Sequence, residues 1–200
     1  MKKNYENSLR EIIKEYNLKP KKKLGQNFLH DKNIISSIVN KANIEDEDII
    51  EIGPGPGILT ESILNNKARS LLAIEKDDSF EVNLKKIKNN YRNNFDYLIN
   101  DVIDFDFKKL TKKNYKFVSN LPYNISVPFI LKMIRIRKII PWKEMILMVQ
   151  KEVAERITAK INTKNYGRLS IMVNLNNDVK KLLNVKPSSF IPRPKVDSTV

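Results

Sequence analysis

The chain has 200 residues, 41% of them hydrophobic, and its 37 Lys and Arg against 23 Asp and Glu give a formal net charge of +14. This length suits one α/β domain, and the basic charge indicates a polyanionic partner. The absence of cysteine excludes disulfides, zinc–thiolate sites, iron–sulfur chemistry and catalysis by a cysteine nucleophile.

Residues 1–23 are expected to form a basic, mobile arm. Residues 7–15 have helical spacing of apolar side chains, but Pro20 and several lysines follow. No apolar run approaches the roughly 20 residues needed to span a bilayer, and the N-terminus lacks an apolar signal core. We therefore expect a cytoplasmic, monomeric protein with no membrane partner, whose folded domain covers residues 24–200.

The first strong pattern is a strand, a glycine-rich turn and a helix. The motif begins with Asp48–Ile52, which reads as a buried strand. An amphipathic helix is predicted before it, with Asp31 as its N-cap. Glycines follow at 53, 55 and 57, ahead of a helix over residues 58–64. The G-x-G-x-G spacing differs from the G-x-G-x-x-G of pyrophosphate sites, so the turn alone indicates only a nucleotide-type βα unit.

Three further strands are expected to end in polar residues. Leu71–Glu75 ends in a carboxylate, 20 positions after Gly55, that can accept both hydroxyls of a ribose. Strands at residues 97–100 and 116–119 lead to Asp101 and Asn120. Ligands of open α/β sheets bind at the carboxyl ends of the strands, so these residues predict a site for an adenosine cofactor, either a dinucleotide or S-adenosylmethionine.

Charge helps to choose between these cofactors. Residues 44–106 contain 14 Asp and Glu against 7 Lys and Arg, a net charge of −7 within a basic chain. An acidic pocket suits the cationic sulfonium of S-adenosylmethionine better than a polyanionic dinucleotide, although a solvated acidic surface would give the same count.

The tetrapeptide Asn120-Leu121-Pro122-Tyr123 suggests the chemistry. An aromatic amine is a poor nucleophile, and the Asn120 side-chain carbonyl with a backbone carbonyl near Leu121 or Pro122 can accept its N–H groups. Tyr123 offers a ring on which a flipped-out base can stack. These residues favour methylation of adenine N6; the alternative is a strand-to-turn boundary with a buried tyrosine.

The rest of the chain continues the alternation of helix and strand. Residues 127–137 predict a helix, 145–149 a buried strand and 151–160 another helix, which together indicate a largely parallel sheet. Phe190 begins a stiff, extended Phe-Ile-Pro-Arg-Pro segment that would present its ring, to a base or to a protein. Basic residues expected to contact phosphates are Lys19, Lys21, Lys22, Lys23, Lys132, Arg135, Arg137, Lys138 and Lys143.

With these residues, the chain resembles the ribosomal RNA small-subunit adenine dimethyltransferases from about Lys21 to Val200. Six motifs carry the resemblance, namely Lys23–Leu29, Glu51–Gly57, Asn120–Ser126, Gln150–Ala154, Gly167–Ser170 and Phe190–Ser198. The resemblance implies a class I S-adenosylmethionine-dependent methyltransferase fold, Rossmann-like, with a largely parallel twisted sheet flanked by helices.

It also implies an activity. Such enzymes transfer methyl groups from S-adenosylmethionine to N6 of two adjacent adenosines near the 3′ end of small-subunit (16S) rRNA, within an immature subunit during ribosome biogenesis, and without a metal. Members of the family continue into a small helical domain that helps to dock on RNA, and we expect this chain to lack it.

The resemblance assigns roles residue by residue. Cofactor contacts would come from Asn27, Leu29, Gly53, Gly55, Glu75, Asp101 and Asn120. Glu75 would hold the ribose and Asp101 the adenine. Asn120, with Leu121 and Pro122, would hold the target amine, and Tyr123 and Phe190 would sandwich the target base.

Two other functions fit parts of the sequence. The macrolide-resistance methyltransferases, which modify large-subunit rRNA, are related, but the Asn120–Ser126 and Lys195–Ser198 strings favour the small-subunit class. A non-catalytic ribosome-assembly or transcription factor could share the fold, although Asn120, Tyr123 and Glu75 argue against lost chemistry.

Overall fold

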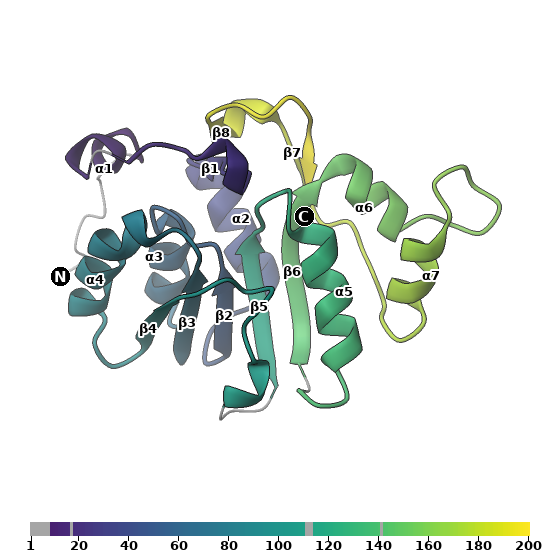
Figure 1. Ribbon diagram of the computed structural model, residues 1–200, viewed down its shortest axis with the longest axis horizontal. Helices are drawn as coiled ribbons and strands as arrows, with labels where there is room; N and C mark the ends of the chain where they lie inside the picture. The colour runs from purple at the N-terminus through teal and green to yellow at the C-terminus, as the bar shows by residue number, and fades with distance from the viewer. Residues whose placement is uncertain (1–8, 17, 111–113, 141) are drawn as a thin grey trace.

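The computed structural model describes residues 9–16, 18–110, 114–140 and 142–200. Five parallel strands form most of a seven-stranded sheet with the order β4-β3-β2-β5-β6-β9-β7 (Figure 1). The parallel strands are β2 (Asp48–Ile52), β3 (Ser70–Glu75), β4 (Phe95–Ile99), β5 (Tyr115–Asn120) and β6 (Trp142–Gln150). The short strands β7 (Asn184–Val185) and β9 (Ser198–Thr199) complete it in antiparallel pairings.

The strand order places a ligand-binding edge at the centre of the sheet. The chain passes from β2 outward through β3 to β4, then returns to place β5 against the other side of β2. The connection after β2 therefore runs toward β3, whereas the connection after the neighbouring strand β5 runs the opposite way, toward β6. Open α/β sheets bind ligands at such a switch point, outside the carboxyl ends of the strands.

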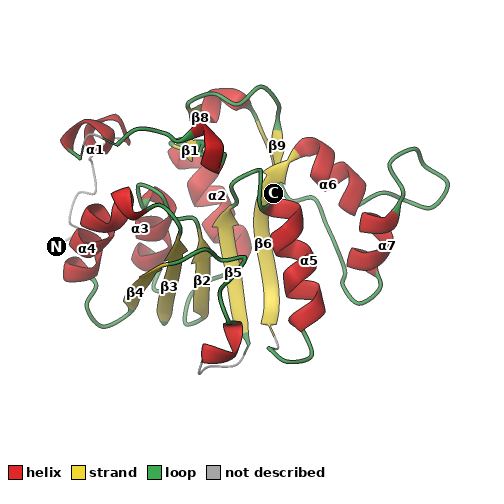
Figure 2. Cartoon of the chain, in the orientation of Figure 1, coloured by secondary structure: helices red, strands yellow, loops and turns green. Residues whose placement is uncertain are grey.

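Helices cover both faces of the sheet (Figure 2). One face, which includes Ile49 of β2, packs against α2 (Lys32–Ala42), α3 (Ile58–Asn65) and α4 (Glu81–Asn90). Ile50, the next residue of β2, points to the opposite face of the sheet. There it belongs to a hydrophobic cluster with residues of α5 (Ser126–Ile136), α6 (Lys151–Ile157) and α7 (Arg168–Asn174). Two-sided burial explains why the strands read as continuous apolar runs.

The predicted α/β architecture is confirmed, with small differences at element ends. The β2 strand has the predicted bounds, and Asp31 caps α2 by accepting from the backbone N–H groups of Asn33 (3.0 Å) and Ile34 (3.3 Å). The β6 strand begins at Trp142, three residues earlier than predicted, because its polar start still pairs with β5. In the part of the chain that the structure describes, no helix is long and apolar enough to cross a membrane.

The predicted mobile arm is wrong for the part of it that the structure describes. Helix α1 (Leu9–Glu15) packs on the domain, and Leu9, Ile12 and Leu18 are buried in the same cluster as α2 and α4. Glu15 also accepts a hydrogen bond from Lys86 of α4, at 3.1 Å. Burial of the apolar face of α1 holds this segment on the domain, despite the positive charge of the lysines that follow. Residues 1–8 of the expected arm lie outside the described residues.

Short elements fold over the carboxyl edge. The β1 strand (Phe28–Leu29) pairs with β8 (Phe190–Ile191) in a separate antiparallel sheet, which joins an early and a late segment of the chain. Single-turn helices lie at η1 (Lys22–Leu24), η2 (Asp78–Phe80), η3 (Phe107–Lys109) and η4 (Pro187–Ser189).

The turn between β2 and α3 needs its glycines. Gly53, Gly55 and Gly57 have φ of 66°, 53° and 82°, in the left-handed region that other residues seldom adopt. A Cβ on Gly57 would lie 2.4 Å from Cδ1 of the buried Ile87 in α4. The turn is also held from α4 by Asn83, whose amide donates to the Pro56 carbonyl at 2.6 Å.

Gly57→Ala is therefore expected to lower the free energy of unfolding by about 2–4 kcal/mol, through backbone strain and overpacking against Ile87. Urea denaturation measures the loss. Gly167→Ala is the matched control, because a Cβ there meets nothing within 4 Å and φ is −168°; it should cost less than about 1 kcal/mol. Equal losses in the two variants would show that the Gly57 turn carries no special constraint.

Candidate active site

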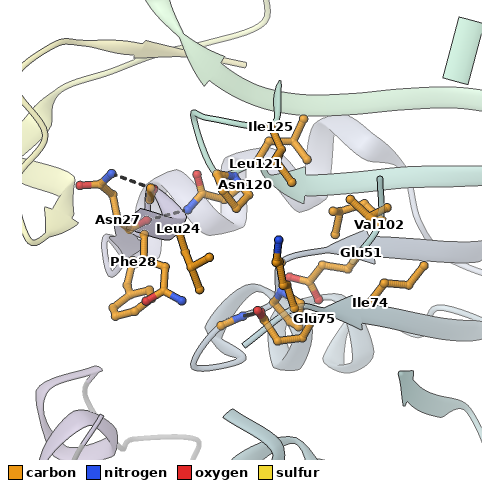
Figure 3. A pocket seen from close by; sticks show the side chains of 18 of the residues that line it. Leu24, Asn27, Phe28, Glu51, Ile74, Glu75, Val102, Asn120, Leu121 and Ile125 are labelled. Atoms are coloured by element: carbon orange, nitrogen blue, oxygen red, sulfur yellow. Dashed lines mark hydrogen bonds between the residues drawn. The ribbon is translucent and has the colours of Figure 1, made fainter. Parts of the chain in front are cut away.

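A pocket opens at the carboxyl edge of the sheet, where the predicted polar residues come together. Its walls are the turns after β2, β3, β4 and β5 and the segment 24–29 (Figure 3). It is lined by the predicted residues Asn27, Leu29, Gly53, Gly55, Glu75, Asp101, Asn120, Leu121, Pro122 and Tyr123. Phe190 does not line it.

Glu75 is a buried carboxylate of this pocket. The side chain ends β3 and accepts hydrogen bonds from two backbone N–H groups, Gly55 to Oε2 at 3.0 Å and Asp77 to Oε1 at 2.8 Å. Burial raises the pKa of Glu75, although both N–H groups favour its charged form. The two bonds fix the carboxylate in one orientation, with further acceptor capacity for ligand hydroxyls.

Asp101 lies one strand farther along the same edge. Lys76 donates to its Oδ2 at 2.6 Å, and the backbone N–H of Ile103 donates to its Oδ1 at 2.9 Å. Burial alone would raise the pKa of Asp101, but these two hydrogen bonds hold it below the ordinary value. The predicted adenine contact is therefore an ionised carboxylate already paired with a lysine.

Asn120 is oriented by a backbone carbonyl. Its side-chain Nδ2 donates to the carbonyl of Asn27 at 3.0 Å, a contact drawn in Figure 3. The amide nitrogen is thus used within the protein, which leaves the side-chain oxygen as an acceptor at the pocket. The neighbouring Pro122 lies close to the glycine turn, because a Cβ on Gly53 would lie 3.1 Å from Pro122 Cδ. A side chain at Gly53 would push the two turns apart.

The two aromatic residues of the predicted base sandwich differ in exposure. Tyr123 lines the pocket half-buried, and its hydroxyl shares a 2.7 Å hydrogen bond with Ser198 Oγ. Phe190 is 1% exposed, because β8 pairs with β1 and carries this ring into the core beneath Leu29 and its neighbours. The prediction that Phe190 presents its ring to a ligand does not fit this arrangement.

The sequence reasoning missed two buried acidic residues, Glu51 in the pocket wall and Asp77 behind it. Glu51 lies inside β2, is 2% exposed, lines the pocket and accepts a hydrogen bond from Thr60 Oγ1 at 2.6 Å. Asp77, also 2% exposed, follows β3. The available signal for Glu51 was a carboxylate within an otherwise apolar strand, since such a group is seldom buried without a task.

Part of the predicted basic surface is used internally. Lys132 on α5 donates to three backbone carbonyls of the segment after Asp101, at 3.2, 2.6 and 2.7 Å. Arg137 donates to the Asn176 carbonyl at 3.0 Å and lies 4.2 Å from the Trp142 ring centroid, and Lys143 pairs with Glu47. Moreover, α5 starts at the carboxyl edge of the sheet, so the end of this helix that leads to Arg137 lies about 16 Å from that edge. For these three residues the predicted phosphate contacts would compete with partners inside the protein.

The Glu51 carboxyl predicts a pH dependence of stability. Burial raises its pKa to about 8, so the folded protein holds this proton more tightly than the unfolded chain. The stability from this group is then fully present below the unfolded pKa of about 4.3 and is lost as the pH rises through about 8.

Between pH 5 and pH 8, the wild type should lose on the order of 3 kcal/mol more free energy of unfolding than Glu51→Gln, which keeps an acceptor for Thr60. Urea denaturation at a series of pH values, with no added ligand, measures the difference. Glu152→Gln, on the exposed side of α6, controls for the removal of one carboxyl. Parallel curves for wild type and Glu51→Gln would contradict the assignment.

Comparison with known proteins places the chain in a family. The family model for ribosomal RNA adenine dimethylase matches residues 17–200. Ribosomal RNA small subunit methyltransferase A of Alkaliphilus oremlandii is 44% identical over 197 residues, which are 96% of this chain and 67% of that protein. The protein of that name from Wolbachia pipientis subsp. Culex pipiens is 43% identical, over 94% of this chain and 71% of its own length.

Solved structures agree with these relatives. A dimethyladenosine transferase from Plasmodium falciparum superposes with a TM-score of 0.75 at 36% identity, covering 86% of this chain and 61% of that one. The 23S rRNA methyltransferase ErmE superposes with a TM-score of 0.67 at 25% identity, covering 86% and 67%. The chain thus spans roughly two thirds of the length of the relatives it matches. By family model, sequence identity and fold, it belongs to the ribosomal RNA adenine dimethylase family.

Proposed function

We propose that this chain transfers methyl groups from S-adenosylmethionine to N6 of two adjacent adenosines near the 3′ end of small-subunit rRNA, during assembly of the subunit in the cytoplasm. The observation that carries the proposal is the oriented Asn120 amide at the rim of a pocket with a buried carboxylate. Relatives named for the small subunit are 43–44% identical, against 25% for the 23S rRNA methyltransferase, which favours the small-subunit substrate.

The pocket residues fit S-adenosylmethionine. Glu75 offers a fixed carboxylate for the ribose hydroxyls, and Asp101 an acceptor for an adenine amine. Ile74 and Val102 add apolar walls beside them. The glycine turn leaves room for the methionine part, and the buried Glu51 adds an acidic group close by. When bound, the cofactor supplies an electrophilic methyl group on a cationic sulfur.

The protein's own contribution at the target amine is hydrogen-bond acceptance. The Asn120 oxygen can accept an N–H from the exocyclic amine, which keeps the nitrogen lone pair available for attack. The Asn27 carbonyl fixes the Asn120 amide beforehand, so little reorganisation is needed when substrate binds. Tyr123 would stack on the flipped base, with its ring held by the hydrogen bond to Ser198.

We assign the RNA surface to exposed cations beside segments that line the pocket or pair with its lining. Lys22 and Lys23 lie in η1, directly before the pocket-lining segment, and Arg193 and Lys195 follow β8. These side chains would contact phosphates and so position the RNA without reading its sequence. We propose that the monomer binds the immature small subunit in this way.

A methyl-transfer assay tests the substrate assignment. Tritiated S-adenosylmethionine is incubated with the protein and either isolated small subunits that lack the modification or isolated large subunits. Label should appear only in small-subunit rRNA, at two adjacent adenosines located by primer extension. Label confined to large-subunit rRNA would assign the chain to the other class, and no label with bound cofactor would indicate a binding role.

Variants in the Asn120 turn test the assigned roles. Asn120→Ala should lower the single-turnover rate by about 100-fold, the loss typical of one oriented hydrogen-bonding group, while cofactor affinity changes far less. Tyr123→Phe keeps the ring and should be milder than Tyr123→Ala. Equal losses for the two tyrosine variants would assign the role to the hydroxyl and its bond with Ser198, and reject simple stacking.

A further inference from the structure

Segment 21–27 crosses the pocket as a strap held at both ends. On one side it reaches Asp77, which follows β3. On the other side it reaches the turn after β5, where Asn120 donates to the Asn27 carbonyl. A Cβ on Gly25 would lie 2.8 Å from Asn124 Oδ1, so the strap also lies against that turn. Residues 24–27 of the strap form one wall of the pocket, so a bound ligand would contact the strap.

Asp77 joins the strap to the sheet through both oxygens of a buried carboxylate. Lys21 Nζ donates to Oδ1 at 2.6 Å, and Gln26 Nε2 donates to Oδ2 at 2.8 Å. The Asp77 side chain is fully buried, whereas that of Lys21 is 48% exposed. The strap is braced internally, since the Lys21 backbone N–H donates to Gln26 Oε1 at 2.7 Å. Charge-assisted bonds of this length are the strong class of hydrogen bond in proteins.

The same residue also holds the carboxylate that is proposed to bind the ribose. The backbone N–H of Asp77 donates to Glu75 Oε1 at 2.8 Å, while its side chain holds the strap. Ser79 donates twice to Asp77 Oδ1, at 3.1 Å from its backbone N–H and 2.6 Å from its hydroxyl, which fixes the side chain at the start of η2. A displaced strap would leave this buried carboxylate without its lysine, so the open arrangement is disfavoured.

We propose that Asp77 is a positioning residue that latches the strap over the pocket, and that its ion pair with Lys21 slows the release of the cofactor. The proposal rests on the proposed function for the identity of the ligand, S-adenosylmethionine. The latch itself is a property of the protein alone. It can be measured in the absence of any ligand.

Limited trypsin digestion measures strap opening directly. The peptide bond between Lys23 and Leu24 lies within the strap, and its cleavage is followed by mass spectrometry on the native chain. Lys21→Met and Asp77→Asn should raise the initial cleavage rate about tenfold, because each removes a charge-assisted hydrogen bond. Lys22→Met is the matched control for strap cleavage and cofactor release, which involve no RNA, since Lys22 is exposed and forms no ion pair among the described residues.

Cofactor binding supplies the second measurement. Isothermal titration and stopped-flow competition should give about tenfold weaker S-adenosylmethionine binding for Lys21→Met and Asp77→Asn, mainly through faster dissociation. The double variant should be no weaker than Asp77→Asn alone, because both changes break one contact.

The outcomes separate the latch from the proposed function. If both single variants match Lys22→Met in cleavage and in dissociation rate, there is no latch. If only Asp77→Asn differs, Asp77 acts through η2 or Glu75 and the ion pair is not the latch, which also overturns the proposal. If the wild type fails to bind S-adenosylmethionine, the proposed function fails, while the cleavage rates still decide whether Asp77 holds the strap.

Discussion

The site depends on the need of one buried carboxylate for hydrogen-bond donors. Glu75 has lost most of its water, and an unsatisfied charge there would be costly. Its two donors come from Gly55, in the turn after β2, and from Asp77, in the turn after β3. Satisfying the carboxylate therefore fixes two turns that belong to different βα units. The glycine turn also lies against Pro122, so the position of the turn after β5 depends on the same carboxylate.

Much of this edge could be predicted from the sequence because parallel strands bring their carboxyl ends to one side. Polar residues that directly follow apolar runs were enough to place Glu75, Asp101 and Asn120 around one pocket, and the structure brings all three to it. The bounds of the elements that were predicted followed from period and length, with errors of a few residues where polar side chains continue a strand, as at the start of β6. Helices α4 and α7 and the short strands β1, β7, β8 and β9 were not predicted. Local pattern and global fold agree here, as they do in a minimally frustrated chain.

Features that depend on contacts between distant segments could not be predicted. Phe190 sits in a Pro-rich run typical of exposed segments, yet pairing of β8 with β1 buries its ring. Lys132 looks like a surface cation in the sequence, but the segment after Asp101 offers it three carbonyls. Asp77 resembles any acidic residue after a strand until Lys21 and Gln26, more than 50 positions earlier, reach it. In each case the partner decides the role, and the partner is visible only in three dimensions.

The hydrogen bond from Asn120 to the Asn27 carbonyl couples the turn after β5 to the wall of the cofactor pocket. The amide that would meet the target adenine is aligned by the very segment that forms a wall of the cofactor pocket. When that segment is displaced, Asn120 loses its partner and its amide is free to turn. A change that displaces the segment would therefore affect the target amine as well as the cofactor. The two halves of the site thus share one mechanical element, and a substitution in it would alter both even where it touches neither ligand.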